Sequence, residues 1–297
     1  MRSQTYILNP HAGRRGGGRS LAERLRRAAP EAEVLQTTRS GEACELASAR
    51  RKEAGRIVIA VGGDGTVHEV GAGLIGGNAA LGVLPTGSGN DFASMIQFPG
   101  SIEQAAAFFA RTPLRRCDVG RVEWCDGNGG SGQAHFFNSL GLAFEGEVAA
   151  RAQRLRRVPG RARYLLAVLV ELLRFRAPQL DLVIDEHRVS ARQFLVAIGN
   201  GRRAGGGFLL NPGAEIDDGL LEVCRADALP LFRLLRILPS VFQGHHIRYA
   251  GVHQTRCREF QLRAESPIAV HADGEILSRS IRKLRVRVLP RTLLLAG

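Results

Sequence analysis

The sequence predicts a two-domain protein: an N-terminal α/β domain on a doubly wound parallel sheet, followed by a mainly antiparallel β-sandwich domain. Strand-like and helix-like stretches alternate up to Asp118, whereas short strand-like runs separated by turn clusters dominate after it. No long low-complexity linker separates the two halves. We therefore expect domains over 1–118 and 119–288 that pack directly and leave a cleft between them. The tail 289–297 could return to the first domain.

Hydrophobic patterning assigns the elements of the first half. Ser20–Ala29 places apolar residues four apart, as in an amphipathic helix capped by Ser20. The run RIVIAV, Arg56–Val61, is apolar after its first residue and predicts a strand buried on both faces. The other expected elements are strands at Thr5–Leu8, Glu33–Leu35 and Ala80–Leu84, a helix at Gly41–Ala54 and a helix starting near Thr66. Ligands of such sheets bind beyond the carboxyl ends of the strands.

The second half contains short strand-like runs between turn clusters such as DGNGGSG at 126–132 and DDG at 217–219. This spacing is typical of an antiparallel sandwich or barrel. The expected strands are Gly120–Trp124, Ala134–Ser139, Leu180–Ile184, Arg192–Ile198, Leu220–Cys224, Glu259–Arg263, Ile268–His271 and Ile281–Leu289. Two helical stretches, Arg161–Arg174 and Pro230–Phe242, interrupt them.

The amino-acid composition indicates the cellular compartment of the protein and the kinds of partner it binds. The five cysteines are odd in number and lack C-x-x-C spacing, which favours a reducing compartment over a disulfide framework or a cysteine zinc site. No apolar run reaches the roughly 20 residues that span a bilayer, and the start of the chain lacks the features of a signal peptide. The formal charge of +13 favours anionic partners, although a GC-rich genome would also enrich arginine.

The segment VGGDGTVHEV, Val61–Val70, follows the buried strand and opens a helix. Gly62, Gly63 and Gly65 allow a sharp turn and a close backbone approach to a ligand, and N–H groups at a helix start favour a phosphate. An anionic Asp64 beside phosphates is explained if it binds Mg²⁺, directly or through water. It is also explained if it accepts a hydrogen bond from a ligand hydroxyl. A plain strand-to-helix turn with an aspartate cap is the alternative.

Two further loops end apolar strands. LGVLPTGSGNDFA, Leu81–Ala93, offers short polar donors at Thr86, Ser88 and Asn90 and would share one crevice with the GGDG loop. NPHAGRRGGGRS, Asn9–Ser20, mimics a phosphate-binding P-loop, but arginine stands where that motif needs lysine, so we reject the P-loop interpretation. A basic loop whose arginines meet phosphate, or a flexible loop without a ligand, stays open.

Together with later segments, these loops resemble the ordered motif set of the diacylglycerol kinase catalytic-domain family, which includes soluble bacterial lipid kinases and the sphingosine and ceramide kinases. The matching segments are Asn9–Gly13, Gly62–Thr66, Pro85–Ala93, Asp118–Gly120, Phe137–Gly141, Gly199–Asn200, Gly205–Phe208, Pro212, Asp217–Leu220 and Asp273–Glu275. They cover nearly the whole chain. GGDGT alone is shared with NAD kinases, whereas PTGSGNDFA and the late DGE narrow the match. The resemblance implies an ATP-dependent lipid kinase with its active site in the cleft between the domains.

The resemblance also implies which residues hold ATP: Asn9, Pro10, His11, Ala12, Gly13, Thr37, Gly62, Gly63, Asp64, Gly65, Thr66, Val67, His68, Glu69, Ser88 and Asn90. Thr37 is carried over although its neighbour Thr38 could fill the same place. ATP is the implied phosphoryl donor and Mg²⁺ the implied metal, since phosphoryl transfer depends mainly on positioning and charge neutralisation.

In HADGE, His271–Glu275, a turn places two carboxylates close together. The resemblance implies that Glu275 accepts the proton of the substrate hydroxyl, that Asp273 supports it, and that Asp64 is the third catalytic residue. Without the other motifs, an Asp-Gly hairpin between two strands would be the preferred interpretation of this segment.

A second metal site, structural or regulatory, is implied at Glu215, Asp218 and Leu220, with the Asp218 carboxylate and two main-chain carbonyls as ligands. A metal-free Asp-Gly turn is the alternative. One departure from the family is Ser94, because relatives often carry arginine directly after NDFA. Arg14 or Arg15 could compensate for it; otherwise ATP or substrate contacts differ here, and activity on diacylglycerol would be low.

Arginines gather before an apolar helix. Between Val148 and Val170 the chain has no acid, while Arg151, Arg154, Arg156, Arg157, Arg161 and Arg163 supply positive charge. Such a segment suits docking on an anionic membrane, at about 1 kcal/mol per arginine; a solvated loop before a core helix is the alternative. We expect a cytoplasmic protein attached peripherally to the inner face of the membrane, with a lipid partner and no specific nucleic acid. A homodimer is left open.

Three functions compete. The first is a lipid kinase that acts on diacylglycerol by default, or on ceramide, a sphingoid base or phosphatidylglycerol, with the acyl chains in an apolar groove of the second domain. The second is a kinase of a small soluble substrate such as NAD. The third is a non-catalytic, nucleotide-binding protein associated with the membrane, which Ser94 favours.

Overall fold

The structure is a computed structural model that describes residues 2–297 except 11–17, 128, 156–157 and 159. The chain divides into two units: unit 1 comprises residues 1–118 and 291–297, and unit 2 comprises residues 119–290. Two long strands, β5 (Leu114–Asp126) and β13 (Glu275–Ala296), carry the chain from one unit to the other.

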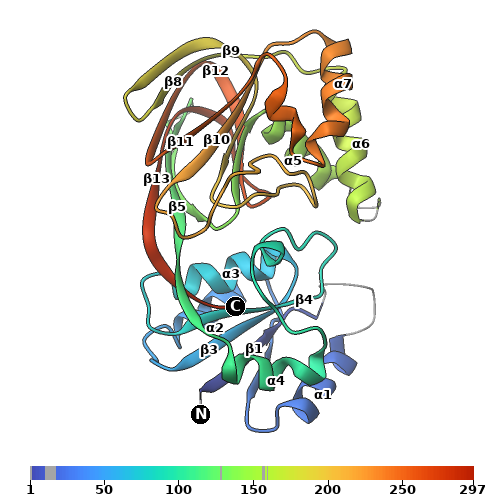
Figure 1. The fold of residues 1–297 in the computed structure, drawn as a ribbon, viewed down its shortest axis with the longest axis vertical. Coiled ribbons are helices and arrows are strands. Elements are labelled where there is room, and N and C mark those ends of the chain that lie inside the picture. Colours follow the sequence, from blue (N-terminus) through green and yellow to red (C-terminus); the bar gives the residue numbers. More distant parts are fainter. Residues whose placement is uncertain (1, 11–17, 128, 156–157, 159) are drawn as a thin grey trace. The chain divides into compact units, whose positions relative to one another are not determined.

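Unit 1 is a parallel sheet with helices on both faces, as the alternating pattern predicted (Figure 1). Its strands lie in the order β13–β4–β3–β1–β2, with β1 at Ser3–Leu8, β2 at Glu33–Gln36, β3 at Arg56–Gly62 and β4 at Ala80–Pro85. The helices are α1 (Gly18–Ala28), α2 (Glu42–Ser48), α3 (Asp64–Leu74), the 3₁₀ turn η1 (Ala93–Met95) and α4 (Ile102–Arg111). α1 and α4 pack on one face around Leu25 and Phe109, and α2 packs against α3.

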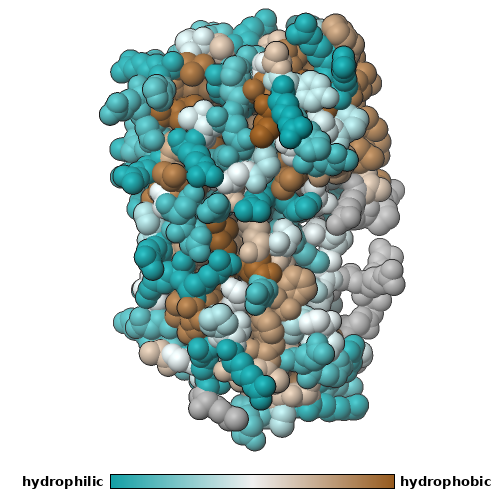
Figure 2. All heavy atoms as spheres, in the orientation of Figure 1, coloured by the Kyte–Doolittle hydropathy of each residue, from teal (hydrophilic) through white to brown (hydrophobic). Residues whose placement is uncertain are grey.

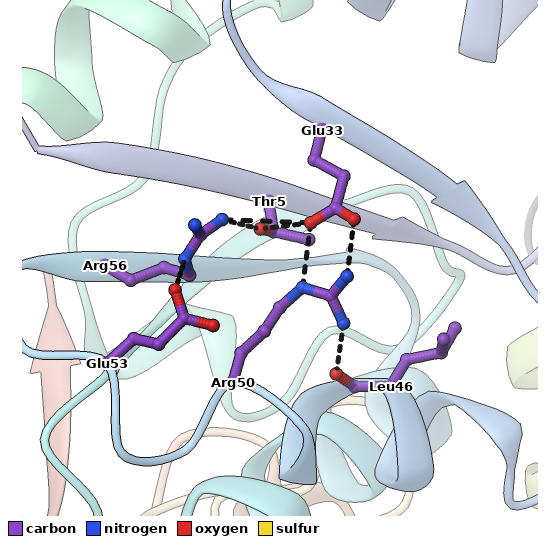
Figure 3. Close-up of polar contacts among 6 residues, drawn as sticks. All are labelled: Thr5, Glu33, Leu46, Arg50, Glu53 and Arg56. Atoms are coloured by element: carbon purple, nitrogen blue, oxygen red, sulfur yellow. Dashed lines mark hydrogen bonds and ion pairs between the residues drawn. The ribbon is translucent and has the colours of Figure 1, made fainter.

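Polar side chains fasten the amino-terminal side of this sheet (Figure 3). Glu33 on β2 accepts hydrogen bonds from Arg50 Nε at 2.8 Å and from the Thr5 hydroxyl on β1 at 3.0 Å. Arg56 at the start of β3 also donates to Thr5, at 2.8 Å, and pairs with Glu53. The Arg50 hydrogen bond is the largest cause that holds the pKa of the Glu33 carboxyl below its usual range. These contacts join three strands at the end opposite to the glycine-rich loops.

Unit 2 is mainly antiparallel sheet, as predicted. Besides β5 and most of β13, its strands are β6 (Ser131–Phe136), β7 (Ser139–Ala143), β8 (Gln179–Ile184), β9 (His187–Gly199), β10 (Leu221–Asp227), β11 (Val252–Cys257) and β12 (Glu259–Ala272). They pair in the order β11–β10–β9–β7–β12–β13, with β8 joined to β9 and β12, and β6 joined to β5. Buried side chains such as Leu142, Val196 and Phe260 form the main core.

A second apolar cluster of unit 2 involves its helices: α5 (Phe144–Arg154), α6 (Gly160–Leu172) and α7 (Leu231–Val241), with the 3₁₀ turn η2 (His245–Arg248) following α7. Three phenylalanines, at 144, 175 and 194, stack or meet edge to face there. None of the helices formed by the described residues is long and apolar enough to cross a membrane.

Helix starts in unit 1 differ from the sequence expectations. α1 begins at Gly18, so Ser20 lies inside the helix and does not cap it. α3 begins at Asp64 rather than near Thr66, with Gly63 as its N-cap. The earlier start places Asp64 in the first helical turn, where the N–H groups are free of helical partners and a carboxylate is stabilised by the helix dipole.

Unit 2 differs from the expectations in several elements. The sequence did not predict β11, and the expected strand Ala134–Ser139 is divided between the end of β6 and the start of β7. The expected strands Glu259–Arg263 and Ile268–His271 form the single strand β12, because shifts in the register with β13 absorb the interruption at Pro267. The sequence did not predict α5, which follows β7 directly because the chain changes direction at Ala143, a residue with φ of 59°.

Candidate active site

The loops of unit 1 begin side by side at the carboxyl edge of its sheet. Amide N–H groups just beyond the strands donate to carbonyls of neighbouring strands: Asn9 to Val61 at 3.3 Å, Thr37 to Leu8 at 2.9 Å and Thr86 to Gly62 at 2.9 Å. The parallel register pairs Gly62 with Pro85, so β3 and β4 end level. This edge therefore brings together the starts of the loops that follow β1, β2, β3 and β4.

The loops after β3 and β4 touch backbone to backbone at Gly63 and Gly87. A Cβ atom added to Gly87 would lie 2.5 Å from the Gly63 Cα, closer than Cβ atoms approach other atoms. A Cβ on Gly62 would lie 2.3 Å from the hydroxyl of Thr66, whose N–H donates to the Gly63 carbonyl at 3.0 Å. Glycine is needed at these places because a side chain would push the loops apart. A Cβ on Gly65, in contrast, meets nothing within 4 Å.

Asp64 and Asn90 tie these two loops together. Oδ1 of Asp64 accepts a hydrogen bond from the N–H of Phe92 at 3.3 Å. Asn90 has φ of 56°, which asparagine tolerates better than most residues, and its Nδ2 donates to the Gly87 carbonyl at 2.9 Å. The Asn90 Oδ1 and the Thr86 hydroxyl are buried and have no partner among the described residues. Two oxygen atoms near the start of α3 are therefore open to a ligand or to water.

The structure favours Thr37 over Thr38 as a ligand-binding threonine. The Thr38 hydroxyl donates to Oε2 of Glu42 at 2.9 Å, and the Thr38 N–H donates to the same oxygen. Thr37 is buried at the end of β2, and its N–H is fixed by Leu8. Thr38 is therefore hydrogen-bonded to the start of α2, whereas Thr37 lies level with the other loop starts.

The remaining residues implied for ATP lie in different surroundings. Glu69 accepts hydrogen bonds from the Ser40 hydroxyl at 3.4 Å and the Ala43 N–H at 3.3 Å, so it fastens α3 to the start of α2. Ser94 is exposed, and its hydroxyl donates to the Asp91 carbonyl of its own turn at 2.6 Å. Pro10 and His68 are half-buried, Val67 is buried, Ser88 is exposed, and His11, Ala12, Gly13, Arg14 and Arg15 lie outside the described residues.

In unit 2, the turn between β12 and β13 holds Asp273 and Glu275 in different environments. Asp273 has φ of 48°, and its carboxylate accepts three backbone N–H groups, from Phe137 at 2.8 Å, Asn138 at 3.0 Å and Ser139 at 2.9 Å. Glu275 is exposed, and no described residue donates a hydrogen bond to its carboxylate. Glu275 is therefore the carboxylate that is free to accept a proton, and Asp273 fixes the turn that carries it.

Two buried ionisable residues beside this turn were missed in the sequence. His271 is 1% exposed; its Nδ1 accepts the N–H of Gly274 at 3.2 Å, and its Nε2 lies 3.4 Å from Oε1 of Glu145. Glu145, on the first turn of α5, is 6% exposed. Gly141 leaves room for the pair, because a Cβ there would lie 2.2 Å from the His271 Nε2. The register of β7 with β12 sets Gly141 opposite His271, and motif spacing does not reveal that register.

Asp218, implied as a metal ligand, lies in the turn before β10. Its Oδ1 accepts the Leu220 N–H at 2.9 Å, and its Oδ2 lies 3.7 Å from Nη1 of Arg256. Glu222 is buried with an unpartnered Oε2 among the described residues; burial raises the pKa of its carboxyl, and Asp218 adds to the rise. Within the described ranges no group of three His, Cys, Asp or Glu side chains could hold a metal, so main-chain carbonyls such as that of Glu215 would be needed.

Unit 2 also contains a narrow cavity of about 100 Å³ lined by α5, α6, α7, β9 and β10. One water molecule needs roughly 10–15 Å³ on this scale, so the cavity accommodates several methylene-sized groups. Its lining is apolar apart from a few side chains, among them Glu145, Cys224 and His246. Burial raises the pKa of the Cys224 thiol to about 12 and lowers the pKa of His246, so both are neutral near pH 7. Such a lining suits an apolar chain with a small polar end.

The two units, a parallel α/β sheet with glycine-rich loops and a mainly antiparallel sheet, define a two-domain protein. Two family models match the chain: the diacylglycerol kinase catalytic domain over residues 4–122, and the YegS C-terminal NAD kinase beta sandwich-like domain over residues 138–297. The chain belongs to this family of diacylglycerol kinases and related lipid kinases.

Relatives and solved structures agree with this assignment. The chain is 35% identical to "Diacylglycerol kinase" of Mycobacterium tuberculosis (strain ATCC 25618 / H37Rv) over 73% of its own length and 70% of the relative. It is 30% identical to "Probable lipid kinase YegS-like" of Chromohalobacter salexigens over 98% of its length and 92% of the relative. A crystal structure of a diacylglycerol kinase from Bacillus anthracis str. Sterne has the same fold, with a TM-score of 0.71, 20% identity and coverage of 99% and 96%. Yeast NADH kinase complexed with NADH is more distant in fold, with a TM-score of 0.57, 12% identity and coverage of 99% and 83%.

Proposed function

We propose that the protein is an ATP-dependent lipid kinase that transfers the γ-phosphoryl group to a lipid hydroxyl, with diacylglycerol as the default acceptor. The observation that carries this proposal is the turn at Asp273–Glu275, where three backbone amides hold one carboxylate and the next one is exposed. Such a turn presents a proton acceptor in a fixed place while its lone pairs stay free. The match to kinase family models in both halves of the chain supports this chemistry.

Each unit would contribute one part of the reaction. In unit 1, the close contact of Gly63 and Gly87 lets N–H groups at the start of α3 approach the phosphates of ATP, and Asn90 offers an oxygen beside them. In unit 2, Glu275 would take the proton of the lipid hydroxyl while that oxygen bonds to the γ-phosphorus and the bond from phosphorus to the ADP oxygen breaks. Mg²⁺ bound with ATP would neutralise phosphate charge, and Asp64 is the carboxylate that we assign to hold it.

The apolar cavity of unit 2 favours a lipid acceptor over a small polar one such as NAD. The walls come from aliphatic and aromatic side chains of the three helices and two strands. An acyl chain in this place would remove apolar surface from water, at about 0.8 kcal/mol per methylene. The polar groups among the described lining residues are too few to compensate a polar nucleotide for the loss of its hydration.

Exposed apolar side chains on two helices favour attachment to a membrane. They are Leu165, Leu166, Leu169 and Leu173 on or directly after α6, and Leu231, Phe232, Leu235 and Phe242 on or directly after α7. Figure 1 shows α6 and α7 together at one side of unit 2, and the same side carries brown surface in Figure 2. Exposed apolar patches of this kind mark interaction sites, and the exposed Arg233 and Arg236 on α7 suit anionic headgroups.

The basic segment before α6 contributes less charge than the sequence suggested. Arg151 pairs with Glu171, which follows the acid-free stretch directly, so its charge is met within unit 2. Arg156 and Arg157 lie outside the described residues. The exposed apolar side chains of α6 and α7 would contribute to membrane binding. Sedimentation with phosphatidylglycerol vesicles tests this: Phe232→Ser should lower the bound fraction, whereas Phe98→Ser, an exposed phenylalanine of unit 1, should not.

The activity is tested by incubating the protein with γ-labelled ATP, Mg²⁺ and a panel of lipids in mixed micelles, with NAD as a soluble control. Label in one lipid class, and a loss of roughly 10²–10⁴-fold in Glu275→Gln, is the expected result. Asp64→Ala should also lose activity. Glu265→Gln is the matched control, because Glu265 is another exposed acid of unit 2 outside the turn. Label in NAD alone, or equal rates for Glu275→Gln and wild type, would overturn the assignment.

A further inference from the structure

The cavity of unit 2 contains one acid whose chemistry the family motifs do not use. Glu145 lines the cavity together with side chains such as Phe144, Val148 and Phe208. It is 6% exposed, and its Oε2 is buried without a hydrogen-bond partner among the described residues. Buried polar atoms are paired in the great majority of cases, so an unpaired carboxylate oxygen in an apolar cavity requires an explanation.

His271 lies beside Glu145 but forms no hydrogen bond with it among the described residues. Its Nε2 lies 3.4 Å from Oε1 of Glu145, while its Nδ1 accepts the N–H of Gly274 at 3.2 Å. His271 is the one basic side chain within 4 Å of Glu145 in the described part of the chain. The Oε2 of Glu145 therefore has no hydrogen-bond donor among the described residues, which is costly for a buried polar atom.

We propose that Glu145 is the acceptor that recognises the polar head of the ligand in this cavity, and that His271 is its positioning residue. The ligand class is an amphiphile with an apolar chain and a head that donates a hydrogen bond, from a hydroxyl or an ammonium group. Its donor bonds to the Glu145 Oε2, which no described residue occupies. This role rests on the proposed lipid kinase function, and it names the chemical group by which the lipid is selected.

The same contacts join the cavity to the turn that carries Glu275. His271 touches Glu145 through Nε2 and the Asp273–Glu275 turn through Nδ1. Gly141 opposite His271 keeps the pair in contact, because a Cβ there would lie 2.5 Å from the Glu145 Cδ. Occupation of the cavity by a head with a donor therefore stabilises the arrangement of the turn, and an anionic head is disfavoured by charge repulsion.

Binding without ATP tests the head-group role separately from catalysis. The probes are monopalmitoylglycerol, hexadecylamine, methyl palmitate and palmitate, which share a C16 chain, and each displaces a neutral polarity-sensitive fluorophore. The hydroxyl and amine ligands should bind about tenfold or more tightly than the ester, and palmitate most weakly. Glu145→Leu should remove this discrimination but keep the affinity for the ester. Glu147→Gln is the control, since Glu147 is on the same helix and pairs with Arg279 instead.

Each outcome decides the matter. A preference for the amine over the hydroxyl assigns an ammonium head, and the reverse order assigns a hydroxyl head. Equal affinity of the wild type for all four ligands, or an equal loss for every ligand in Glu145→Leu, overturns the role of Glu145. Discrimination without lipid phosphorylation would retain this role and remove the kinase assignment. Lipid phosphorylation without discrimination between the head groups would retain the kinase assignment and remove this role of Glu145.

Two substitutions of His271 test the positioning role. His271→Asn keeps an acceptor near the Nδ1 position for Gly274 but loses the contact to Glu145. His271→Gln keeps a donor near the Nε2 position but loses the acceptor for Gly274. The first should raise the KM for lipid more than it lowers kcat, and the second should lower kcat more than it raises KM. If KM and kcat change in the same way in both variants, His271 is only structural. The same conclusion follows if the melting temperature falls equally in both variants and neither changes KM and kcat differently.

Discussion

Replacing Asp273 separates the support of the turn from the chemistry of the base. Its carboxylate accepts N–H groups from Phe137, Asn138 and Ser139 at 2.8, 3.0 and 2.9 Å, and these residues are at most 7% exposed. Asp273→Ala leaves three buried amides without acceptors, at about 1–3 kcal/mol each. Alanine must also adopt the φ of 48°, at about 1–2 kcal/mol. The loss is therefore at least about 4 kcal/mol, a large part of the roughly 5–15 kcal/mol that stabilises a domain.

Two companion variants should behave differently. Asp273→Asn keeps one oxygen for Asn138 and Ser139 and tolerates the left-handed conformation, so that only Phe137 loses its acceptor, at about 1–3 kcal/mol. Glu275→Gln should leave the free energy of unfolding unchanged, because Glu275 is exposed and accepts no bond from the described residues. The same change should lower kcat by roughly 10²–10⁴-fold.

Urea denaturation followed by tryptophan fluorescence measures this. Trp124, the only tryptophan of the sequence, lies on β5 within unit 2 and reports the unfolding of that unit. The urea midpoints should fall from wild type and Glu275→Gln, which coincide, to Asp273→Asn and then to Asp273→Ala. A wild-type midpoint for Asp273→Ala refutes the reasoning. A shift in Glu275→Gln as large as that in Asp273→Ala also refutes it.

Three further changes test unit 1. Gly87→Ala should lower nucleotide affinity roughly tenfold or more and reduce the melting temperature, because its Cβ would meet the backbone of the β3 loop. Gly65→Ala has open space for its Cβ and should keep the wild-type melting temperature, so an equal loss of melting temperature in the two variants would contradict the backbone contact. Ser94→Arg should raise kcat/KM for ATP at low salt, because Ser94 is exposed and its hydroxyl bonds within its own turn, so an arginine there could meet phosphate charge. An unchanged kcat/KM would show that other residues meet the phosphate charge. Glu33→Gln should lower the melting temperature near neutral pH but not in acid. Arg50 depresses the pKa of Glu33 in the folded protein. The stabilisation by the Glu33 carboxylate is therefore present above its unfolded pKa of about 4.3 and is lost as the pH falls through its folded pKa. A pH-independent difference between Glu33→Gln and wild type would exclude this ion pair as the cause.

The elements that the sequence predicts are those in which one local pattern decides the structure. The segment of β3 is apolar after Arg56 and cannot be exposed on either face, and the glycines after it require a sharp turn. α5 lacks such a signal, since its start depends on Ala143 adopting φ of 59°. β12 crosses Pro267 only because its register with β13 shifts there. These features come from pairing between strands far apart in the sequence, which no local pattern contains.

The same limit applies to the site. GGDGT, PTGSGNDFA and DGE are contiguous strings, so their residues can be found by reading along the chain. The motif places two acids together at Asp273 and Glu275, but only the structure shows that amides from the β6–β7 connection occupy the first of them. Glu145 and His271 meet because β7 pairs with β12. A glutamate beside a phenylalanine in a helix, and a histidine in a strand, carry no signal of that meeting.

Asp64 shows how fixing a loop can be separated from carrying a charge. Its Oδ1 accepts the Phe92 N–H at 3.3 Å, a long bond that a neutral amide oxygen could replace. Asp64→Asn should therefore keep the contact between the loops and lower the melting temperature only slightly, through the lost interaction with the helix dipole, while the charge that would meet Mg²⁺ is lost. If the catalytic role is electrostatic, kcat falls at saturating ATP and Mg²⁺ although the fold is unchanged. If Asp64 only ties the loops, Asp64→Asn keeps its activity and Asp64→Ala loses stability and activity together. Comparing the two variants therefore measures the charge and the shape separately, at the residue where the sequence alone could not decide between them.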